Sequence, residues 1–272
     1  KDTNELVATK KYDRTAEDIF YFDVVATNPA DPAKSDRIFV KVLIGDINDH
    51  APVIVMPEKT SITFSEGLPV GSVVTQVYAT DDDRNANADV GYRIVESEAR
   101  QLFQLDGTTG VITSLRMWDF DTLPVEQRSI EFTVTATDNG QEQKFTDTVA
   151  LTVTIVDAND FDPVFDPGTI APFTVSEDAA INTAAHLFVA TDADQAATFT
   201  AYKFELRSAV GPFGIRSNGE LFLTQPLDYE QVKAYSVLVA VVNLAPRSDG
   251  SSAESVATVA IAVGNVNDEA PV

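Results

Sequence analysis

The fold of this 272-residue chain is decided by a short acidic phrase that ends in proline and occurs three times. It reads DINDHAP at residues 46–52, DANDFDP at residues 157–163 and NVNDEAP at residues 265–271. The aspartates in its fourth position, Asp49, Asp160 and Asp268, stand about 110 residues apart. A fixed period of this length indicates tandem structural repeats.

Further phrases recur in the same register between these three. Ser65-Glu66 corresponds to Ser176-Glu177, and ATDDD at residues 79–83 corresponds to ATDAD at residues 190–194. WDFD at residues 118–121 corresponds to LDYE at residues 227–230 and, more weakly, to YDRT at residues 12–15. Because several features agree in order and spacing, the acids belong to a repeated structural plan.

The segments between these phrases have the two-residue period of β-strands. Apolar side chains alternate with polar ones at Ile130, Phe132, Val134 and Ala136, and again at Tyr235, Val237, Val239 and Val241. Short alternating runs of this kind, broken by Asp-Gly, Asn-Gly and Pro, indicate antiparallel strands. About seven strands in roughly 110 residues predict an all-β chain of seven-stranded β-sandwiches.

The repeat period also predicts domain boundaries. Residues 53–160 form one full repeat, and residues 161–272 form a second full repeat with the start of the next linker. Residues 1–52 correspond only to the C-terminal half of a repeat. Half a sandwich leaves its inner face without a partner sheet, so we do not expect this segment to fold alone.

Charge and composition restrict the function. Forty-two acidic residues against nineteen basic ones give a formal net charge of −23, which disfavours binding to nucleic acids and anionic membranes. The chain has no cysteine, which excludes disulfides, thiolate metal sites and cysteine nucleophiles. The acids can be solvated loop residues or ligands of cations, and their repeated register favours ligands.

The junction between the two full repeats gathers the most acids. A sandwich can bring the Ser-Glu, Asp-x-Asp and linker phrases to one end, where the next repeat's Asp-x-Asp joins them. The carboxylates concerned are Glu66, Asp119, Asp121, Asp160, Asp192 and Asp194. Two such charges 4 Å apart repel by about 4 kcal/mol at an effective dielectric constant near 20. Ca²⁺ suits this set because it takes six to eight hard oxygen ligands, whereas Zn²⁺ prefers His or Cys.

These phrases, in this order, resemble the extracellular cadherin repeat, and the resemblance covers nearly the whole chain. It implies Greek-key sandwiches joined end to end, with up to three Ca²⁺ ions at each complete junction. For the second junction, it implies two inner ions held by Glu66, Asp119, Asp121 and Asp160, with the backbone oxygen of Ala158 and with Asp194. It implies a third ion held by Asn159, the carbonyl of Phe161, Asp192 and Asp194.

Two departures from the family pattern concern this junction. Asp121 stands where the family has a glutamate, and Asn243 stands where an aspartate closes the third site. The resemblance therefore implies a weakened third ion.

The other two junctions are expected to be incomplete. The first has a downstream set that favours an ion of the third type: Asn48, Asp49, the carbonyl of His50, Asp81, Asp83, the carbonyl of Asn87, and Asp138. Its upstream set has Asp13, but Thr15 replaces the family glutamate, so we expect poor occupancy there. The third junction offers Glu177, Asp228, Glu230 and Asp268 for inner ions.

The resemblance implies an extracellular, cell-surface adhesion module that contacts other cadherin ectodomains, its own kind or a different one. Its parent is expected to be anchored in the plasma membrane by a segment outside this chain. The alternative is an extracellular binding module for an unrelated protein ligand. No catalytic triad phrase or phosphate-binding loop is present, and the only histidines are His50 and His186, so no enzyme is predicted.

Overall fold

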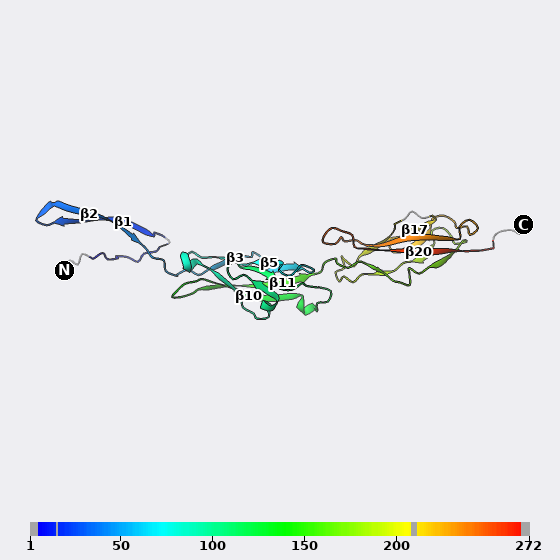
Figure 1. Cartoon of the computed structure of the whole chain (residues 1–272), viewed down its shortest axis with the longest axis horizontal. Helices are drawn as coiled ribbons and strands as arrows, with labels where there is room; N and C mark the ends of the chain where they lie inside the picture. Colours follow the sequence, from blue (N-terminus) through cyan, green and yellow to red (C-terminus); the bar gives the residue numbers. More distant parts are fainter. Residues whose placement is uncertain (1–4, 15, 208–210, 268–272) are drawn as a thin grey trace. The chain divides into compact units, whose positions relative to one another are not determined.

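The computed structural model describes residues 5–14, 16–207 and 211–267, and nearly all of its regular structure is β-strand (Figure 1). The chain divides into two compact units. One comprises Lys1–Ile62, Pro69–Arg116 and Ile130–Thr154, and the other comprises Thr63–Leu68, Met117–Ser129 and Ile155–Val272. The acids of the second junction therefore fall within a single unit, as do those of the first.

The first structured element is a two-stranded hairpin. β1 (Ile19–Asn28) pairs antiparallel with β2 (Asp31–Leu43), with Ile19 opposite Leu43 and a register shift at Thr27. Many of its apolar side chains are exposed: Tyr21, Val24, Val25, Ile38, Phe39 and Leu43. By the register of the hairpin, Tyr21, Val25, Phe39 and Leu43 lie on one face, and Val24 and Ile38 lie on the other.

Residues 53–160 contain the first sandwich. One sheet has the order β4-β11-β10-β7, a second has the order β5-β9-β8, and β3 pairs with β6. Their bounds are β3 (Val53–Met56), β4 (Ser61–Ser65), β5 (Val73–Gln76), β6 (Tyr78–Thr80), β7 (Gly91–Ile94), β8 (Phe103–Leu105), β9 (Val111–Ser114), β10 (Ser129–Thr137) and β11 (Thr146–Val156). One helical turn, α1 (Ala99–Leu102), and two 3-10 turns, η1 (Asn85–Ala88) and η2 (Val125–Gln127), lie between strands.

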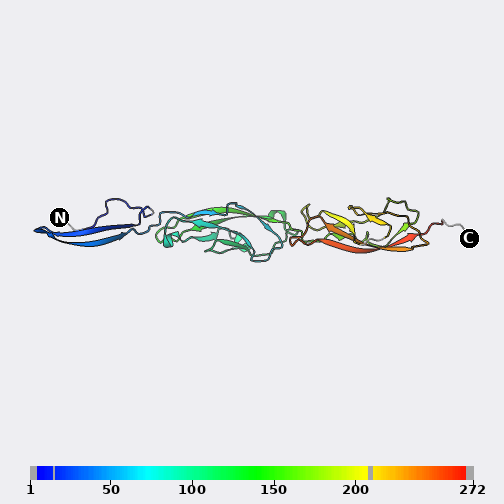
Figure 2. The ribbon, with the colours of Figure 1, turned by 90° about the horizontal axis from the view of Figure 1, so that it is seen from above.

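The second sandwich repeats this order strand for strand. Its sheets are β13-β20-β19-β16 and β14-β18-β17, and β12 pairs with β15. The strands are β12 (Val164–Phe165), β13 (Phe173–Ser176), β14 (Ala184–Leu187), β15 (Ala190–Thr191), β16 (Tyr202–Leu206), β17 (Phe213–Ile215), β18 (Glu220–Leu223), β19 (Ala234–Asn243) and β20 (Glu254–Gly264). Figure 2 shows the strands of this sandwich, coloured yellow to red, in two layers.

The predicted all-β sandwich class is confirmed by this architecture. The first two strands of each sandwich are interrupted, so β3 with β4 and β5 with β6 each count as one strand of a seven-stranded plan. β13 runs parallel to β20, whereas β19 runs antiparallel to it. The parallel pairing of β13 with β20 places Ser176 opposite Gly264, so the Ser-Glu phrase lies beside the end of the last strand.

The alternating side chains form the two cores. Phe132, Val134 and Ala136 on β10 are buried, and Val237, Val239 and Val241 on β19 pack in the second core. On β20 the buried set is Val259, Ile261 and Val263, which decides a phase that the sequence left open. Burial of this apolar surface stabilises each sandwich by roughly 25 cal/mol per Å², so the loops at its ends are held on a firm scaffold.

Candidate metal centres

Glu66 anchors the acidic cluster of the second junction. It follows β4, and its side chain is only 3% exposed. Its Oε1 accepts a hydrogen bond from the N–H of Ala158 at 2.8 Å, and its Oε2 accepts one from the N–H of Phe120. One carboxylate thus ties together the Ser-Glu phrase, the Asp-x-Asp phrase and the linker.

Two groups of acids meet around Asp121. Oxygen atoms of Glu66, Asp119 and Asp121 lie within 4.8 Å of one another, and so do those of Asp121, Asp160 and Asp194. Of these, Asp194 is 4% exposed and accepts a hydrogen bond from the N–H of Phe161 at 3.3 Å. Asp192 Oδ1 accepts one from the N–H of Asp194 at 3.0 Å.

Several oxygens in this cluster are buried without a hydrogen-bond partner. They are both carboxylate oxygens of Asp121, Oδ1 of Asp157, Oδ2 of Asp192 and Oδ2 of Asp194. Native proteins leave few buried polar atoms unsatisfied, because each costs about 1–3 kcal/mol or more when charged. A set of orphaned carboxylate oxygens this dense fits a divalent cation with hard oxygen ligands, and Ca²⁺ is the cation with that preference.

The pKa values of the same acids show the repulsion. Burial, opposed by the two N–H donors and reinforced by Asp157 and Asp121, raises the pKa of Glu66 to about 7. Burial and repulsion from Asp157, Asp160 and Asp119 raise the pKa of Asp121 to about 6. Burial first, and then neighbouring charges, raise the pKa of Asp194 to about 6 and also raise that of Asp160.

Asp157 was not among the residues that the sequence singled out. Its Oδ2 accepts hydrogen bonds from the backbone N–H groups of Gln195, at 3.1 Å, and of Ala196. Hydrogen bonding to the Asp157 side chain helps to raise the pKa of Glu66, and the charge of Asp157 helps to raise the pKa of Asp121. The signal was present in the repeat, because Asp46 and Asp157 each stand three residues before the predicted linker aspartate.

The third position of the second junction is filled by amide groups. Nδ2 of Asn243 donates to Oδ1 of Asn159 at 3.2 Å and to the carbonyl of Phe199 at 2.7 Å. Asn159 in turn donates to the carbonyl of Ala245 at 2.7 Å. The Asn243 amide thus bonds Oδ1 of Asn159, an expected ligand of the third ion, while its own Oδ1 is buried without a hydrogen-bond partner.

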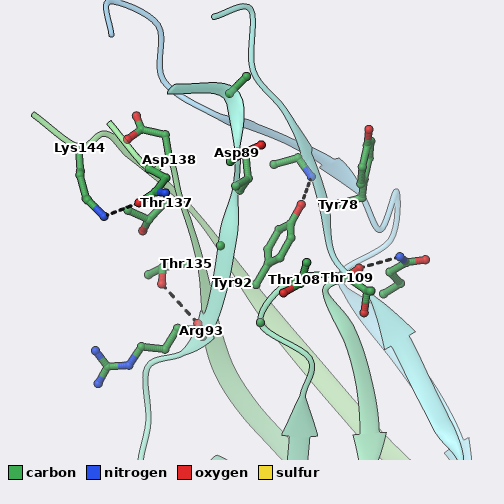
Figure 3. A pocket seen from close by; sticks show the side chains of 17 residues that line it. Tyr78, Asp89, Tyr92, Arg93, Thr108, Thr109, Thr135, Thr137, Asp138 and Lys144 are labelled. Carbon is green, nitrogen blue, oxygen red and sulfur yellow. Dashed lines mark hydrogen bonds between the residues drawn. The ribbon is translucent and has the colours of Figure 1, made fainter. Parts of the chain in front are cut away.

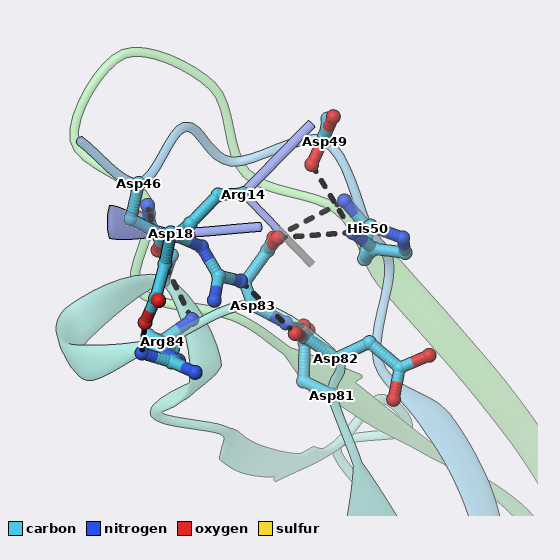
Figure 4. A network of polar contacts seen from close by, with 10 residues as sticks. Arg14, Asp18, Asp46, Asp49, His50, Asp81, Asp82, Asp83 and Arg84 are labelled. Carbon is cyan, nitrogen blue, oxygen red and sulfur yellow. Dashed lines mark hydrogen bonds and ion pairs between the residues drawn. The ribbon is translucent and has the colours of Figure 1, made fainter. Parts of the chain in front are cut away.

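At the first junction, the downstream acids meet as the spacing suggested. Oxygen and nitrogen atoms of Asp49, His50 and Asp83 lie within 4.8 Å of one another (Figure 4). Asp83 Oδ2 accepts from the backbone N–H of His50 at 3.1 Å, and Asp81 Oδ1 accepts from the N–H of Asp83 at 2.9 Å. Burial raises the pKa of Asp81, and its Oδ2 is buried without a partner.

Asp138 lies on the same side of this junction but is held differently. It is 2% exposed and accepts hydrogen bonds from Asn48 Nδ2 at 3.1 Å, Phe145 N–H at 2.9 Å and Gly140 N–H at 3.1 Å. Burial would raise its pKa, but these donors lower it. The carboxylate is therefore kept ionised beside Asn48, whose own Oδ1 is buried and unpartnered.

The remaining predicted residues are more dispersed. Asp13 lines a small cavity with Arg14, Asp46 and Asp49. Asn87 contributes its side-chain amide to Asp46 Oδ2 at 3.0 Å, a contact that the sequence did not suggest.

The third junction repeats the anchor of the second. Glu177 Oε2 accepts from the N–H of Tyr229 and Oε1 from that of Val266, both at 2.6 Å. Asp228 accepts from the N–H of Gln231 at 2.9 Å, and Glu230 from Asn265 at 3.4 Å. Asp268, predicted to complete this set, lies outside the described residues.

A groove of the first sandwich extends from Asp138 along β7. It is lined mainly by polar side chains and backbone beside β7, including Tyr92, Thr108 and Thr135 (Figure 3). The Tyr92 hydroxyl accepts a hydrogen bond from the N–H of Ala79 at 2.8 Å, so this ring is part of the sandwich structure. Of the predicted ligands, Asp138 lines one side of this groove, together with Asp89.

Both histidines and the single tryptophan have structural contacts. His50 pairs with Asp83 and Asp49, and His186 stacks on Phe173 with ring centroids 4.0 Å apart. Trp118 is 2% exposed, as expected for a packed side chain beside the acidic cluster. Within the described residues, no helix is long and apolar enough to cross a bilayer.

Comparison with known proteins agrees with the repeat period. The model of the cadherin domain matches residues 60–156 and 171–264. The chain is 29% identical over 271 residues to human protocadherin Fat 4, covering 98% of the chain but only 5% of that protein. It is 31% identical to human protocadherin-1 over 286 residues, covering 98% of the chain and 26% of the relative. The chain thus spans only a small part of its curated relatives.

Solved structures show the same fold. Extracellular cadherin domains 3–6 of protocadherin gamma B2 match 94% of this chain and 61% of that one, with a TM-score of 0.69 and 23% identity. The human desmocollin-1 ectodomain matches 96% of this chain and 50% of that one, with a TM-score of 0.67 and 24% identity. At this level of identity, the likeness concerns the fold alone.

Proposed function

Because this chain belongs to the cadherin family, we propose that it is a calcium-dependent segment of an adhesion ectodomain, in which Ca²⁺ binds at the linkers between repeats. Cadherin domains typically bind Ca²⁺, and they are adhesion modules without enzymatic activity. The observation that carries the proposal is the set of orphaned buried carboxylate oxygens around Asp121.

We assign two inner ions to the second linker. The ligands proposed are Glu66, Asp119, Asp121, Asp157, Asp160 and Asp194, with the backbone oxygen of Ala158. Bound Ca²⁺ would supply positive charge and six to eight coordination positions to these oxygens. Glu66 already bonds the linker through Ala158, so neutralising its neighbours removes the repulsion that opposes this closed arrangement.

A third ion is not proposed at the second linker. The amide of Asn243 donates hydrogen bonds to the carbonyl of Phe199 and to Oδ1 of Asn159, and the latter is an oxygen that a third ion would need. Asp192 and the carbonyl of Phe161, expected from the family pattern to bind it, would then serve only as neighbours of the inner set.

The first and third linkers are proposed to bind fewer ions. At the first, Asn48, Asp49, Asp81, Asp83 and Asp138 gather on the downstream side, with the carbonyls of His50 and Asn87 as further candidates. One ion of the third type is proposed there. At the third, Glu177, Asp228, Glu230 and Asp268 are proposed as ligands that require the next repeat to complete the site.

We further infer that residues 1–52 are the C-terminal half of a repeat, followed by repeats at residues 53–160 and 161–272. The β1–β2 hairpin supports this division. It has the long antiparallel form of β19 and β20 and leaves Tyr21, Ile38 and Phe39 exposed.

The partner class proposed is another cadherin ectodomain, of the same or a different kind. The relatives support an extracellular place on a membrane-anchored protein, since one of them is named cadherin EGF LAG seven-pass G-type receptor 1. Sedimentation velocity at several protein concentrations, in 2 mM Ca²⁺ and in chelator, tests self-association. A single monomeric species at all concentrations would leave only heterophilic contact.

Calcium uptake tests the proposed function itself. Equilibrium dialysis against ⁴⁵Ca²⁺ should show saturable binding with dissociation constants on the order of 10⁻⁴ to 10⁻³ M. Glu66→Gln should remove most of the binding assigned to the second linker, whereas Glu126→Gln, an exposed residue outside the cluster, should remove none. Uptake that is absent, or equal in the two variants, would contradict the proposal.

A further inference from the structure

The first linker has an arginine at a sequence position where the second has a phenylalanine. YDRT at residues 12–15 occupies the place of WDFD at residues 118–121, so Arg14 stands at the position of Phe120. In the same comparison, uncharged Thr15 stands at the position of Asp121. The upstream set of the first linker has therefore lost one carboxylate and gained one guanidinium.

The Arg14 side chain is directed into this linker rather than into solvent. It is 9% exposed, and its Nε forms an ion pair with Oδ1 of Asp46, whose side chain is 12% exposed (Figure 4). Its Nη2 donates to the carbonyl of Asp82 at 3.2 Å. Arg14 thus bonds the linker phrase and the Asp-rich turn of the following repeat, both of which would contribute ligands to a cation.

Asp46 has its second oxygen satisfied as well. Oδ2 accepts hydrogen bonds from the backbone N–H of Arg84 and the side-chain amide of Asn87, each at 3.0 Å. Burial would raise the pKa of Asp46, but these donors and the guanidinium lower it. Its Oδ1 accepts no hydrogen bond, and the ion pair with Arg14 is what compensates the charge there.

The corresponding residue of the second linker, Asp157, lacks this compensation. Its Oδ2 accepts two backbone donors, from Gln195 and Ala196, where Asp46 Oδ2 accepts one backbone and one side-chain donor. The Oδ1 atoms of both aspartates are buried without a hydrogen bond, and the difference is that the Arg14 guanidinium pairs with that of Asp46. The nearby cation, Arg128, donates to the carbonyl of Phe120 and to Oε1 of Gln195. The same scaffold therefore leaves one aspartate neutralised and its counterpart exposed to repulsion.

We propose that the Arg14 guanidinium replaces the inner calcium ions of the first linker, so that this linker stays closed around Asp46 without calcium at that position. A divalent cation placed there would meet the guanidinium at short range and find one carboxylate fewer. The inference rests on the proposed function, because it assigns different cations to two linkers of the same kind.

Hydrogen exchange measured by mass spectrometry can follow both linkers in one experiment. The backbone amide of Arg84, which donates to Asp46, reports on the first linker, and those of Gln195 and Ala196, which donate to Asp157, report on the second. In wild-type protein, changing from 2 mM Ca²⁺ to chelator should accelerate exchange at residues 195–196 at least tenfold more than at residue 84. The amide of residue 84 stays bonded to Asp46 even when the ion of the third type is removed from Asp81 and Asp83. Loss of the calcium effect at residues 195–196 would contradict the proposed function, whereas a calcium effect of the same size at residue 84 would contradict only this inference.

Two substitutions separate the charge of Arg14 from its size. Arg14→Gln should accelerate exchange at residue 84 at least tenfold in chelator, while Arg14→Lys, which keeps the charge, should stay within a few-fold of wild type. Arg37→Gln is the matched control, because Arg37 lies on β2 and is exposed. Equal exchange in Arg14→Gln and wild type, or equal acceleration in Arg14→Gln and Arg14→Lys, would overturn the proposal.

Discussion

Single side chains decide which cation each linker uses. The buried Oδ1 of Asp46 pairs with Arg14, whereas Asp121 and Asp157 have buried oxygens without a hydrogen-bond partner. Asn243 places an amide where the family pattern has a carboxylate. Under the proposed function, these differences within one repeated plan would give the linkers different calcium requirements.

The role of Asn243 can be tested by restoring the carboxylate. The Asn243→Asp variant should bind one additional Ca²⁺ per chain. The new carboxylate is repelled by the surrounding oxygen atoms, and a bound cation removes that repulsion. In chelator, the free energy of unfolding should fall by about 1–3 kcal/mol. The new carboxylate is buried, and it cannot donate the hydrogen bonds that the Asn243 amide gives to Asn159 and Phe199. Urea unfolding and equilibrium dialysis measure the two effects, with the exposed Asn218→Asp as control.

An unchanged stoichiometry in Asn243→Asp would contradict the account of the third position. Equal free energies of unfolding for Asn243→Asp and Asn218→Asp in chelator would also contradict it. The hydrogen bonds donated by the Asn243 amide would then add nothing to stability.

The raised pKa values predict how stability depends on pH. Glu66, Asp121 and Asp194 have pKa values of about 7, 6 and 6 when folded, above their values in the unfolded chain. The folded state therefore binds more protons, and its stability in chelator should increase as the pH falls from 7.5 to 5.5, by on the order of 1 kcal/mol. In Ca²⁺ the trend should reverse, because protons compete with the ion.

Melting temperatures in chelator and in 2 mM Ca²⁺, taken across this pH range, check both signs. The calcium-induced increase in melting temperature should shrink toward pH 5.5. A chelated protein that loses stability steadily on mild acidification would be inconsistent with these pKa directions.

Sequence reasoning found most of the site residues but not their partners. Glu66, Asp121, Asp160 and Asp194 stood out because they recur at fixed spacing, and the structure brings them together. Asp157 was overlooked although its spacing repeats too. The contacts of Arg14 and Asn243 could not be predicted, because a side chain's direction depends on loops that the repeat does not specify.

At the scale of elements, the strands were predicted by alternation and the loops were not. β10 and β19 bury the side chains that their period indicated, whereas β20 had apolar residues on both phases, so only packing could decide it. The interruption between β5 and β6 has no sequence signal that we can identify. The linker phrases do not show the two-residue alternation of strands, because their acids lie at the strand ends.

The linker segment offers a matched pair of neighbouring aspartates. Asp160 belongs to a group of close carboxylates, whereas Asp162 pairs with Arg247 at 2.7 Å. Asp160→Ala should remove most of the calcium-dependent stabilisation, which for one site at twenty times its dissociation constant is roughly 2 kcal/mol. Asp162→Ala should retain it. Thermal melting with and without Ca²⁺ measures the difference, and equal losses in the two variants would refute the ligand assignment.

At the scale of the whole molecule, the linkers are proposed to differ in stiffness. The second linker should flex without Ca²⁺, because its carboxylates repel one another, and become ordered with it. The first linker should depend less on Ca²⁺, because Arg14 supplies a permanent charge. An acidic chain of this kind, with a net charge of −23, would thus couple its flexibility to extracellular calcium mainly through one linker.

The distance distribution between the two sandwiches tests this account most directly. The chain has no cysteine, so Gln104→Cys and Gln225→Cys, both at exposed positions, can carry a donor and an acceptor dye for single-molecule energy transfer. The account predicts a broad distribution in chelator that narrows in 2 mM Ca²⁺, and one that stays broad in Ca²⁺ when Glu66→Gln is added. Distributions of equal width in chelator and in Ca²⁺ would contradict it.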